Sequence, residues 1–337
     1  MSPGLHTTVQ DLGRFGYQAL GVPVSGALDG FSLRLANALV GNPPGAAALE
    51  FLLSGATLEV VAERVRVALA AAGAVLSPAG GPPVPAWESR TFRRGDILRV
   101  VLGTRSGCAY LAVEGGIAVE PVLGSCATYT RACLGGFQGR ALRQGDIVPV
   151  AVARTAVGTE LRLSPPSPAA PDRPVRVVLG PQEEYFTADA ISTLLACDFR
   201  VSPSSDRMGM RLDGPALQHR RGWDIASDAI ATGAVQVPGS GHPIMLLADH
   251  QTTGGYPKIA TVISADLPAV GRRRPGDTVR FTAVTAEAAE QLCRDQEREL
   301  AALIAAIEPV PESGGFDAAS LYSANLISGV SNGGEEL

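Results

Sequence analysis

The chain has 337 residues, of which 46% are hydrophobic and 18% are charged, so it is long enough for two ordered domains that each bury a core. A net charge of −5 and a pI near 5.5 give no basic surface for nucleic acid. Aromatic residues make up 5% of the chain, too few for a base-stacking face, and we therefore expect no nucleic-acid partner.

Short β-type runs, separated by glycine and proline, dominate the predicted elements. Several alternate apolar and polar residues, as half-buried antiparallel strands do. Helices are few: one is capped by Asp29 and stops at Gly41, a short one starts at Thr187, and the longest covers about 286–307 with one apolar face. The predicted strands are 57–61, 64–67, 96–101, 110–113, 175–179, 244–247, 259–263 and 278–281.

The proline-rich stretch 165–174 is typical of a stiff, solvated linker and predicts a domain boundary. We expect an N-terminal domain over 1–164 and a C-terminal domain over 175–283, which would carry the functional site. The long helix (284–308) and a tail rich in Ser, Gly and Asn (309–337) follow.

A weak internal repeat also favours two related β-rich units. Leu-Asp-Gly ends at Gly30 and at Gly214, an offset of 184 (214 − 30). Gly-Ala before a strand recurs with an offset of 178 (233 − 55), and Gly-Asp before a strand recurs with an offset of 181 (276 − 95). At these offsets the second unit is polar where the first is apolar, so we expect the reactive pocket in the second.

The N-terminus lacks the basic and apolar regions of a signal peptide, and the longest apolar stretch (65–76) is broken by Arg66 and too short for a membrane span. The five scattered cysteines form no Cys-x-x-Cys pair and no zinc spacing, which fits free thiols. The histidines show no metal-binding spacing, so we predict no metal site. We expect a cytoplasmic protein without a membrane partner.

Lys258 is the only lysine in the chain, and all other basic residues except histidine are arginine. Arginine supplies surface charge, but it is a planar fork that does not lose its proton. Lysine is a compact point charge whose pKa responds to burial. Keeping one ammonium group in the densest polar and glycine-rich run of the chain indicates a task that arginine cannot perform.

Three polar clusters contain the candidate site residues. We expect Lys258 and Arg207 to neutralise negative charge on a ligand, and Asp249 to hold an amide N–H or act as a general base. Each cluster also has a structural alternative: an edge strand, an Asp–Arg salt bridge or a tight turn. The candidate binding residues are Gln10, Asp11 and Arg14 in the first cluster, Met208 in the second, Gln251, Thr252, Thr253, Gly254, Gly255 and Tyr256 in the third, and Gln236.

These clusters, taken together, resemble the allophanate hydrolase subunit 2 or biotin-dependent carboxyltransferase-like family. That family includes the C subunit of bacterial 5-oxoprolinase, KipA and the carboxyltransferase part of urea carboxylase. The matching stretches run in order: 7–14 (TTVQDLGR), 25–29 (SGALD), 36–37, 39–42 (LVGN), 110–116 (YLAVEGG), 135–140 (GGFQGR), 180–182 (GPQ), 205–209 (SDRMG), 236–238 (QVP), 249 with 251–258 (QTTGGYPK), and 275–277 (PGD).

The resemblance implies a mainly β fold with two cyclophilin-like β-barrel domains. It also implies partners: a subunit-B-like protein of cyclophilin fold, and the A subunit of the same enzyme. Two stretches depart from the family pattern, Cys126-Ala-Thr-Tyr129 and Gly271-Arg272. The first departure puts a role for its loop in question.

Three functions are compatible with this resemblance. The first is the C subunit of an ATP-dependent 5-oxoprolinase, which opens the lactam of 5-oxoproline to glutamate together with its partners. The second is a carboxyltransferase component that moves CO₂ from biotin on a separate carrier protein to a urea-like nitrogen. The third is a non-enzymatic, KipA-like binder of a subunit-B-like partner. A fold does not separate them, because function resides in the site.

Overall fold

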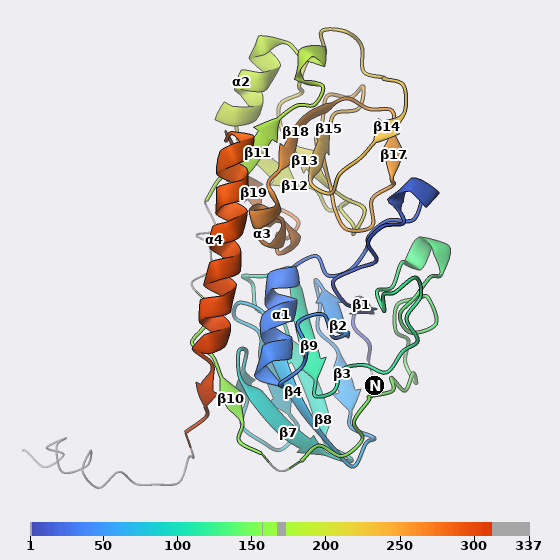
Figure 1. Ribbon diagram of the computed structural model, residues 1–337, viewed down its shortest axis with the longest axis vertical. Coiled ribbons are helices and arrows are strands. Elements are labelled where there is room, and N and C mark those ends of the chain that lie inside the picture. Colours follow the sequence, from blue (N-terminus) through green and yellow to red (C-terminus); the bar gives the residue numbers. More distant parts are fainter. Residues whose placement is uncertain (1, 157, 167–172, 312–337) are drawn as a thin grey trace, which may run out of the picture.

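The computed structural model describes residues 2–156, 158–166 and 173–311. Two β-rich halves lie one above the other along the long axis of the molecule, and a long helix runs beside both (Figure 1). Each half has its own hydrophobic core. The predicted mainly β fold with few helices is confirmed.

The first half consists of a five-stranded sheet in the order β1-β2-β9-β4-β7 and a four-stranded sheet in the order β3-β8-β5-β6. Strand β9 is buried at every position because β2 and β4 flank it within the sheet. The strands are β1 His6–Gln10, β2 Ala48–Leu52, β3 Thr57–Glu59, β4 Arg64–Ala70, β5 Val75–Pro78, β6 Val84–Pro85, β7 Ser89–Arg93, β8 Ile97–Val101 and β9 Cys108–Val113.

The second half is built on an eight-stranded sheet in the order β19-β12-β13-β16-β15-β18-β11-β20. Its two edge strands, β19 and β20, are separated in sequence by Arg280 alone, so the sheet curls until its ends meet and forms a nearly closed barrel. The strands are β11 Val175–Leu179, β12 Phe199–Val201, β13 Gly209–Asp213, β15 Ala234–Gln236, β16 Ile244–Leu246, β18 Lys258–Val262, β19 Thr278–Val279 and β20 Phe281–Ala283; β14 Asp228–Ala229 and β17 Thr253–Gly254 form a separate ribbon.

The helices begin where their capping residues predict. Asp29 accepts a hydrogen bond from Ser32 N at the start of α1, and Thr187 accepts one from Ala190 N at the start of α2. All three predicted helices are therefore confirmed, with starts that agree to within two residues; α1 ends two residues before Gly41, and α4 ends at Ala305, three residues before the predicted bound of 308. Their bounds are α1 Gly30–Leu39, α2 Ala188–Ala196 and α4 Ala286–Ala305; shorter helical turns are η1 Gln18–Leu20, η2 Thr130–Ala132, η3 Glu183–Tyr185, η4 Ser264–Asp266 and α3 Leu267–Gly271.

Helix α4 contacts both halves. Its Gln296 Nε2 donates to Ala265 O in the second half at 2.6 Å, and its Glu297 accepts two bonds from Arg34 of α1 at 2.7 and 2.9 Å. Leu300 is buried in the core of the first half. Beyond the helix, β21 (Glu308–Pro309) pairs with β10 (Leu161–Arg162). Of the predicted linker and tail, residues 167–172 and 312–337 lie outside the described part of the chain.

The proposed internal repeat does not correspond to equivalent structure. Gly30 opens helix α1, whereas Gly214 directly follows strand β13. The strand after Gly55 pairs with β8, whereas the strand after Gly233 pairs with β16 and β18. Turns of Gly before a strand are common in any β protein, so the shared order of these landmarks was coincidental. The two halves are distinguished by their separate cores.

The seam between the halves contains one of the two departures from the family pattern. Arg272 pairs with Asp29 at 2.7 Å, and its carbonyl accepts from Gly107 N at 2.6 Å. A Cβ at Gly271 would lie 2.4 Å from Leu28 O, so only glycine permits this approach of the two backbones. The Gly271-Arg272 pair therefore has a structural role in joining the halves.

Candidate active site

The amine of Lys258 lies below the protein surface at the start of β18. Its side chain is 3% exposed, and Nζ donates to Asp228 Oδ2 at 2.8 Å and to Ala229 O at 3.2 Å. The side chain of Asp228 is 50% exposed, so it forms the solvent side of this ion pair. A ligand that approaches the amine from solvent would therefore meet it at the β14–β17 ribbon.

One glutamine, Gln182, bonds to this ion pair, and two more, Gln236 and Gln251, bond to each other on the neighbouring strand and turn. Gln182 Oε1 accepts from Lys258 N at 3.1 Å, while its Nε2 donates to Asp228 at 3.2 Å. Gln236 is the register partner of Lys258 in β15, and its Oε1 accepts from Gln251 Nε2 at 3.4 Å. Each primary amide carries both a donor and an acceptor, as an amide, lactam or ureido group does. Gln182 and Gln236 already use both within the chain, so a ligand would have to replace one of these bonds.

Gly254 allows the ribbon to lie directly on these amides. A Cβ there would meet Ile230 Cδ1 at 2.7 Å, Gln236 Nε2 at 2.9 Å and Gln251 Nε2 at 3.4 Å. The other residues of this turn contribute through the backbone or at the surface. In the backbone, Thr252 O accepts from Ile230 N at 3.0 Å and Gly255 O accepts from Ile225 N at 2.8 Å. Thr253 pairs with Ala229 in the β14–β17 ribbon. At the surface, the centroid of the exposed Tyr256 ring lies 6.3 Å from that of Trp223.

The hydrogen bond from Lys258 is the main cause that holds the pKa of Asp228 below its ordinary value of 3.8, with the Ala229 N–H next. Because folding lowers the pKa of this carboxyl, its ionised form stabilises the folded protein at pH values above 3.8. This contribution is lost as the pH falls through the lower pKa of the folded state. We expect a ¹³C NMR titration of the Asp228 carboxyl to show a midpoint below 3.8, and Lys258→Met to return it towards 3.8. A midpoint that the substitution leaves unchanged would show that the pair does not form in solution.

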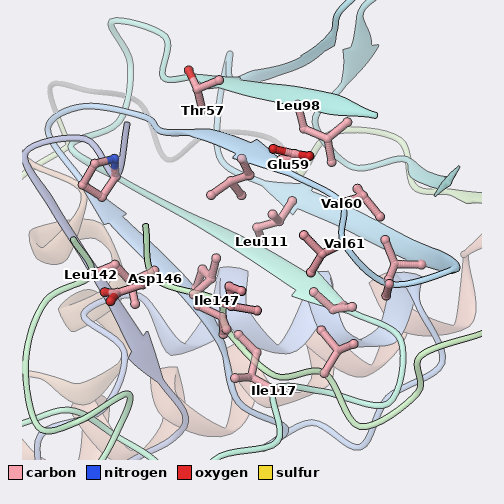
Figure 2. A pocket seen from close by; sticks show the side chains of 18 of the residues that line it. Thr57, Glu59, Val60, Val61, Leu98, Leu111, Ile117, Leu142, Asp146 and Ile147 are labelled. Atoms are coloured by element: carbon pink, nitrogen blue, oxygen red, sulfur yellow. The ribbon is translucent and has the colours of Figure 1, made fainter. Parts of the chain in front are cut away.

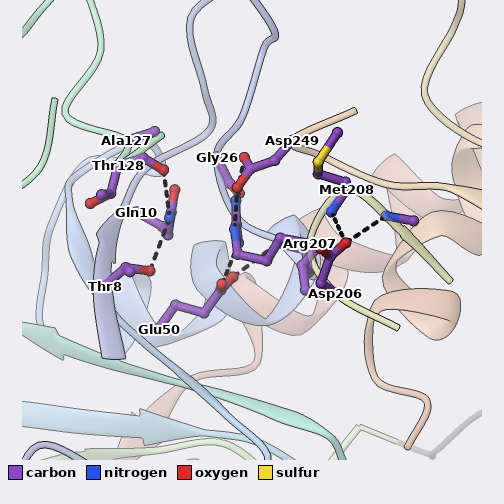
Figure 3. Close-up of polar contacts among 12 residues, drawn as sticks. Thr8, Gln10, Gly26, Glu50, Ala127, Thr128, Asp206, Arg207, Met208 and Asp249 are labelled. Atoms are coloured by element: carbon purple, nitrogen blue, oxygen red, sulfur yellow. Dashed lines mark hydrogen bonds and ion pairs between the residues drawn. The ribbon is translucent and has the colours of Figure 1, made fainter. Parts of the chain in front are cut away.

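A second polar assembly, centred on Arg207, lies at the seam (Figure 3). Arg207 Nε and Nη2 donate to Asp249 at 2.8 and 3.1 Å, Nη1 donates to Glu50, and Nη2 also donates to Gly26 O at 2.6 Å. Glu50 in turn accepts from the hydroxyl of Tyr110 at 2.6 Å. Burial opposes the charge of Arg207, but Glu50 and Asp249 outweigh it and raise the pKa of the guanidinium.

From the sequence we expected Arg207 and Asp249 to share a pocket with Lys258. In the structure they do not share one. Four N–H donations of Arg207 are already directed to Asp249, Glu50 and Gly26, and both oxygens of Asp249 are used by Arg207. Neither Arg207 nor Asp249 is a hydrogen-bond partner of the Lys258 amine. A saturated buried ion pair has little capacity left for a ligand, so these bonds favour a positioning role; the catalytic roles expected for the two residues stay predictions.

The first polar cluster, with Met208 beside Arg207, also lies along the seam. Asp11 accepts from Gly13 N, Ser125 Oγ and Cys126 N, and Gln10 Nε2 donates to Thr128 O at 3.2 Å. The departure from the family pattern at 126–129 thus contacts this cluster through its backbone. Met208 contributes its main chain, since its N–H donates to Asp206 at 2.8 Å.

Sequence reasoning missed the residues that complete both assemblies. Asp228 and Gln182 bond to Lys258, while Glu50 bonds to Arg207 and also accepts from the hydroxyl of Tyr110. Gln182 and Tyr110 had a signal, since Gln182 ends the GPQ stretch and Tyr110 begins the YLAVEGG stretch quoted for the family resemblance. Asp228 lies in the two-residue strand β14, which is too short to show a pattern, and Glu50 is a single polar residue in strand β2.

Two cavities lie elsewhere. One of about 350 Å³ opens into the first half, where Leu98, Leu111 and Ile117 point into an apolar interior (Figure 2). Asp146 at its rim is held by Arg140, whose hydrogen bond lowers the pKa of that carboxyl to about 2. The other, of about 710 Å³, lies against α4 and includes Arg272. Neither is lined by Lys258, Arg207 or Asp249.

The structure shows no group of three His, Cys, Asp or Glu side chains placed to hold a metal ion within residues 2–156, 158–166 and 173–311. None of the helices in that part of the chain is long and apolar enough to cross a bilayer. All five cysteines are described and none forms a disulfide.

The chain belongs to the family described as carboxyltransferase domain, subdomains A and B, which it matches over residues 20–283. This confirms the resemblance to the biotin-dependent carboxyltransferase-like family. The polar cluster at Gln10, Asp11 and Arg14 and helix α4 lie outside the matched stretch.

Among its relatives, the 5-oxoprolinase C subunits of Haemophilus influenzae and Escherichia coli are 37% and 36% identical. These alignments cover 86% and 88% of this chain and 92% and 94% of the relatives. The urea amidolyase of Saccharomyces cerevisiae is 31% identical over 88% of this chain, which spans only 17% of that protein. The crystal structure of the K. lactis urea amidolyase is similar with a TM-score of 0.79 at 28% identity, over 90% of this chain and 19% of that one.

Proposed function

We propose that this chain is the C subunit of an ATP-dependent 5-oxoprolinase, which opens the lactam of 5-oxoproline to glutamate together with an A subunit and a subunit-B-like partner. Two relatives that are named as C subunits of 5-oxoprolinase support this proposal, because the chain spans more than nine-tenths of each. The observation that carries it is the buried Lys258 amine, which is paired with the half-exposed Asp228 and lies on a strand whose backbone N–H bonds to the Gln182 amide.

The chemistry requires activation of the amide, because a lactam carbonyl is a poor electrophile. In the proposed reaction the lactam oxygen attacks the γ-phosphorus of ATP and ADP leaves. A first water adds to the carbon and the C–N bond breaks, with a proton passing to the nitrogen, which gives an acyl phosphate and a free amine. A second water then hydrolyses the acyl phosphate to the carboxylate of glutamate and phosphate. Lys258 would stabilise the negative charge on the lactam oxygen, a role for which a preorganised cation in a water-poor site is suited. Gln251 and Gln236 would orient the ring through its amide group.

A carboxyltransferase component is the second candidate, supported by the family match over residues 20–283 and by the urea amidolyase relatives. In that reaction the carboxyl group of N-carboxybiotin, attached to another protein, passes to a urea-like nitrogen. The same amides would then bind the ureido ring, and Lys258 would stabilise the oxygen of biotin as CO₂ departs.

Purification of the chain with its partner subunits separates these functions. We expect ATP hydrolysis that depends on 5-oxoproline and yields glutamate in equal amount. Activity that requires urea and a biotinylated carrier would support the carboxyltransferase instead. A stable complex that turns over neither substrate would refute both and favour a regulatory, KipA-like binder.

A further inference from the structure

The exposed segment 222–229 covers the amine of Lys258. It supplies both hydrogen-bond partners of Nζ, the carboxylate of Asp228 at 2.8 Å and the carbonyl of Ala229 at 3.2 Å. The Lys258 side chain is 3% exposed and that of Asp228 is 50% exposed, so the segment lies between the amine and solvent. A ligand that is to contact the amine must therefore first displace this segment.

The segment is attached weakly along its length. Seven of its eight residues are exposed, and Ile225 is partly buried. Its strand β14 forms a ribbon of two residue pairs with β17, apart from the barrel sheet and on the side of the molecule opposite α4 (Figure 1). Beside that ribbon, Ile225 N donates to Gly255 O at 2.8 Å, and Gln182 Nε2 donates to Asp228 at 3.2 Å. Segments with exposed hydrogen bonds and little buried apolar surface open locally at a low cost in free energy.

Both ends of the segment are anchored. Before it, Arg220 N donates to Tyr185 O at 2.6 Å; after it, Ile230 is 4% exposed and its N donates to Thr252 O at 3.0 Å. Gly222 begins the segment with a φ of 99°, a left-handed conformation that glycine adopts without strain and that suits a hinge. The segment can therefore move between fixed ends.

The segment rests on the backbone of two glycines. A Cβ at Gly255 would lie 3.3 Å from Ile225 O, and one at Gly239 would lie 3.1 Å from the ring of Trp223. Trp223 is 52% exposed, so one face of its ring packs on this backbone and much of the rest faces solvent. The ion pair of Asp228 with Lys258 is a charge-assisted hydrogen bond, the strongest kind of contact that the segment makes.

We propose that residues 222–229 form a lid over Lys258 and that Asp228 is its latch, so that a ligand reaches the amine only when this ion pair is broken. The lid controls access to the site of the proposed function, and its role in turnover therefore rests on that function. Its movement does not require catalysis and can be measured on the full chain alone.

Hydrogen exchange of the backbone amides tests the lid. We expect Asp228→Asn to accelerate exchange of the Ile225 amide about 5- to 10-fold, the effect of weakening one half-exposed charged hydrogen bond. The amide of the buried Val262, which donates to Gly233 O, should exchange as before. Asp224→Asn is the matched control, since Asp224 is an exposed acid of the same segment that does not bond to the amine, and it should behave as the wild type does. Unchanged exchange at Ile225, or equal acceleration at Val262, would overturn the proposal.

Lys258 provides a second measurement because it is the only lysine of the chain. Its reductive methylation by formaldehyde and a borohydride, followed by mass spectrometry of the peptide that contains it, reports how often the amine becomes accessible. Trp223→Ala loosens the lid without changing the charge beside the amine, so we expect about 3- to 10-fold faster methylation, the effect of losing one aromatic contact. A methylation rate that neither Trp223→Ala nor Asp228→Asn changes would refute the lid. The proposed function fails separately, if these data hold but the assembled subunits release no glutamate.

Discussion

If this chain acts as the proposed 5-oxoprolinase subunit, we expect Lys258→Met to lower the turnover of the assembled enzyme by about 10²- to 10³-fold, the usual effect of removing one group that stabilises transition-state charge. Methionine keeps most of the buried stem, so the cavity cost stays small. Asp228, the partner left behind, is half exposed and water can solvate it. The chain should therefore fold and bind its partner subunits, as circular dichroism and gel filtration would show.

Lys258→Arg decides whether charge alone is sufficient. The guanidinium is larger and planar, and the buried position beside Gln182 and Ala229 is occupied by a compact ammonium group. We expect this variant to be nearly as slow as Lys258→Met. Wild-type turnover in Lys258→Met would show that the amine has no part in the mechanism. Full activity in Lys258→Arg would show that a positive charge at this position is sufficient.

The second large effect concerns stability. Arg207→Met should reduce the free energy of unfolding by about 3–5 kcal/mol, because it leaves the carboxylates of Glu50 and Asp249 buried without their common counter-charge. Urea denaturation monitored by fluorescence would measure this loss. Arg294→Met is the matched control: its ion pair with Glu290 lies on the exposed surface of α4, and the expected change is below about 1 kcal/mol.

A double substitution tests whether the charges are coupled. Because Glu50→Gln removes one of the two stranded carboxylates, Arg207→Met combined with Glu50→Gln should be less destabilised than the sum of the single changes. Strict additivity would contradict the buried network. A loss below about 1 kcal/mol for Arg207→Met alone would contradict it as well.

The elements of this fold could be predicted from the sequence wherever the signal is local. Asp29 and Thr187 cap their helices through bonds to residues three positions later, and the alternating pattern identified strands such as β8 and β11. Lys258 could also be singled out from the sequence, since it is the only lysine. Its burial agrees with the prediction that it does more than supply surface charge.

The partners of the site residues could not be predicted, because each pairing joins segments far apart in the chain. Glu50 meets Arg207 across 157 positions, and Asp228 meets Lys258 across 30, through a ribbon too short to show a pattern. The sequence placed Arg207 and Asp249 with Lys258 because all three lie in polar runs. Composition does not tell which polar side chains saturate one another and which remain available for a ligand.

Helix α4 has a consequence for how a ligand reaches the seam. On the outside of the molecule, Glu297 and Gln296 of this helix fasten it to α1 and to Ala265, while inside the molecule Arg207 joins the same halves. A hinge rotation of one half against the other would have to break both attachments at once. Entry by local displacement of the exposed loop around Phe15 and Leu20 breaks neither attachment, so we expect the two halves to behave as one rigid body when a ligand enters.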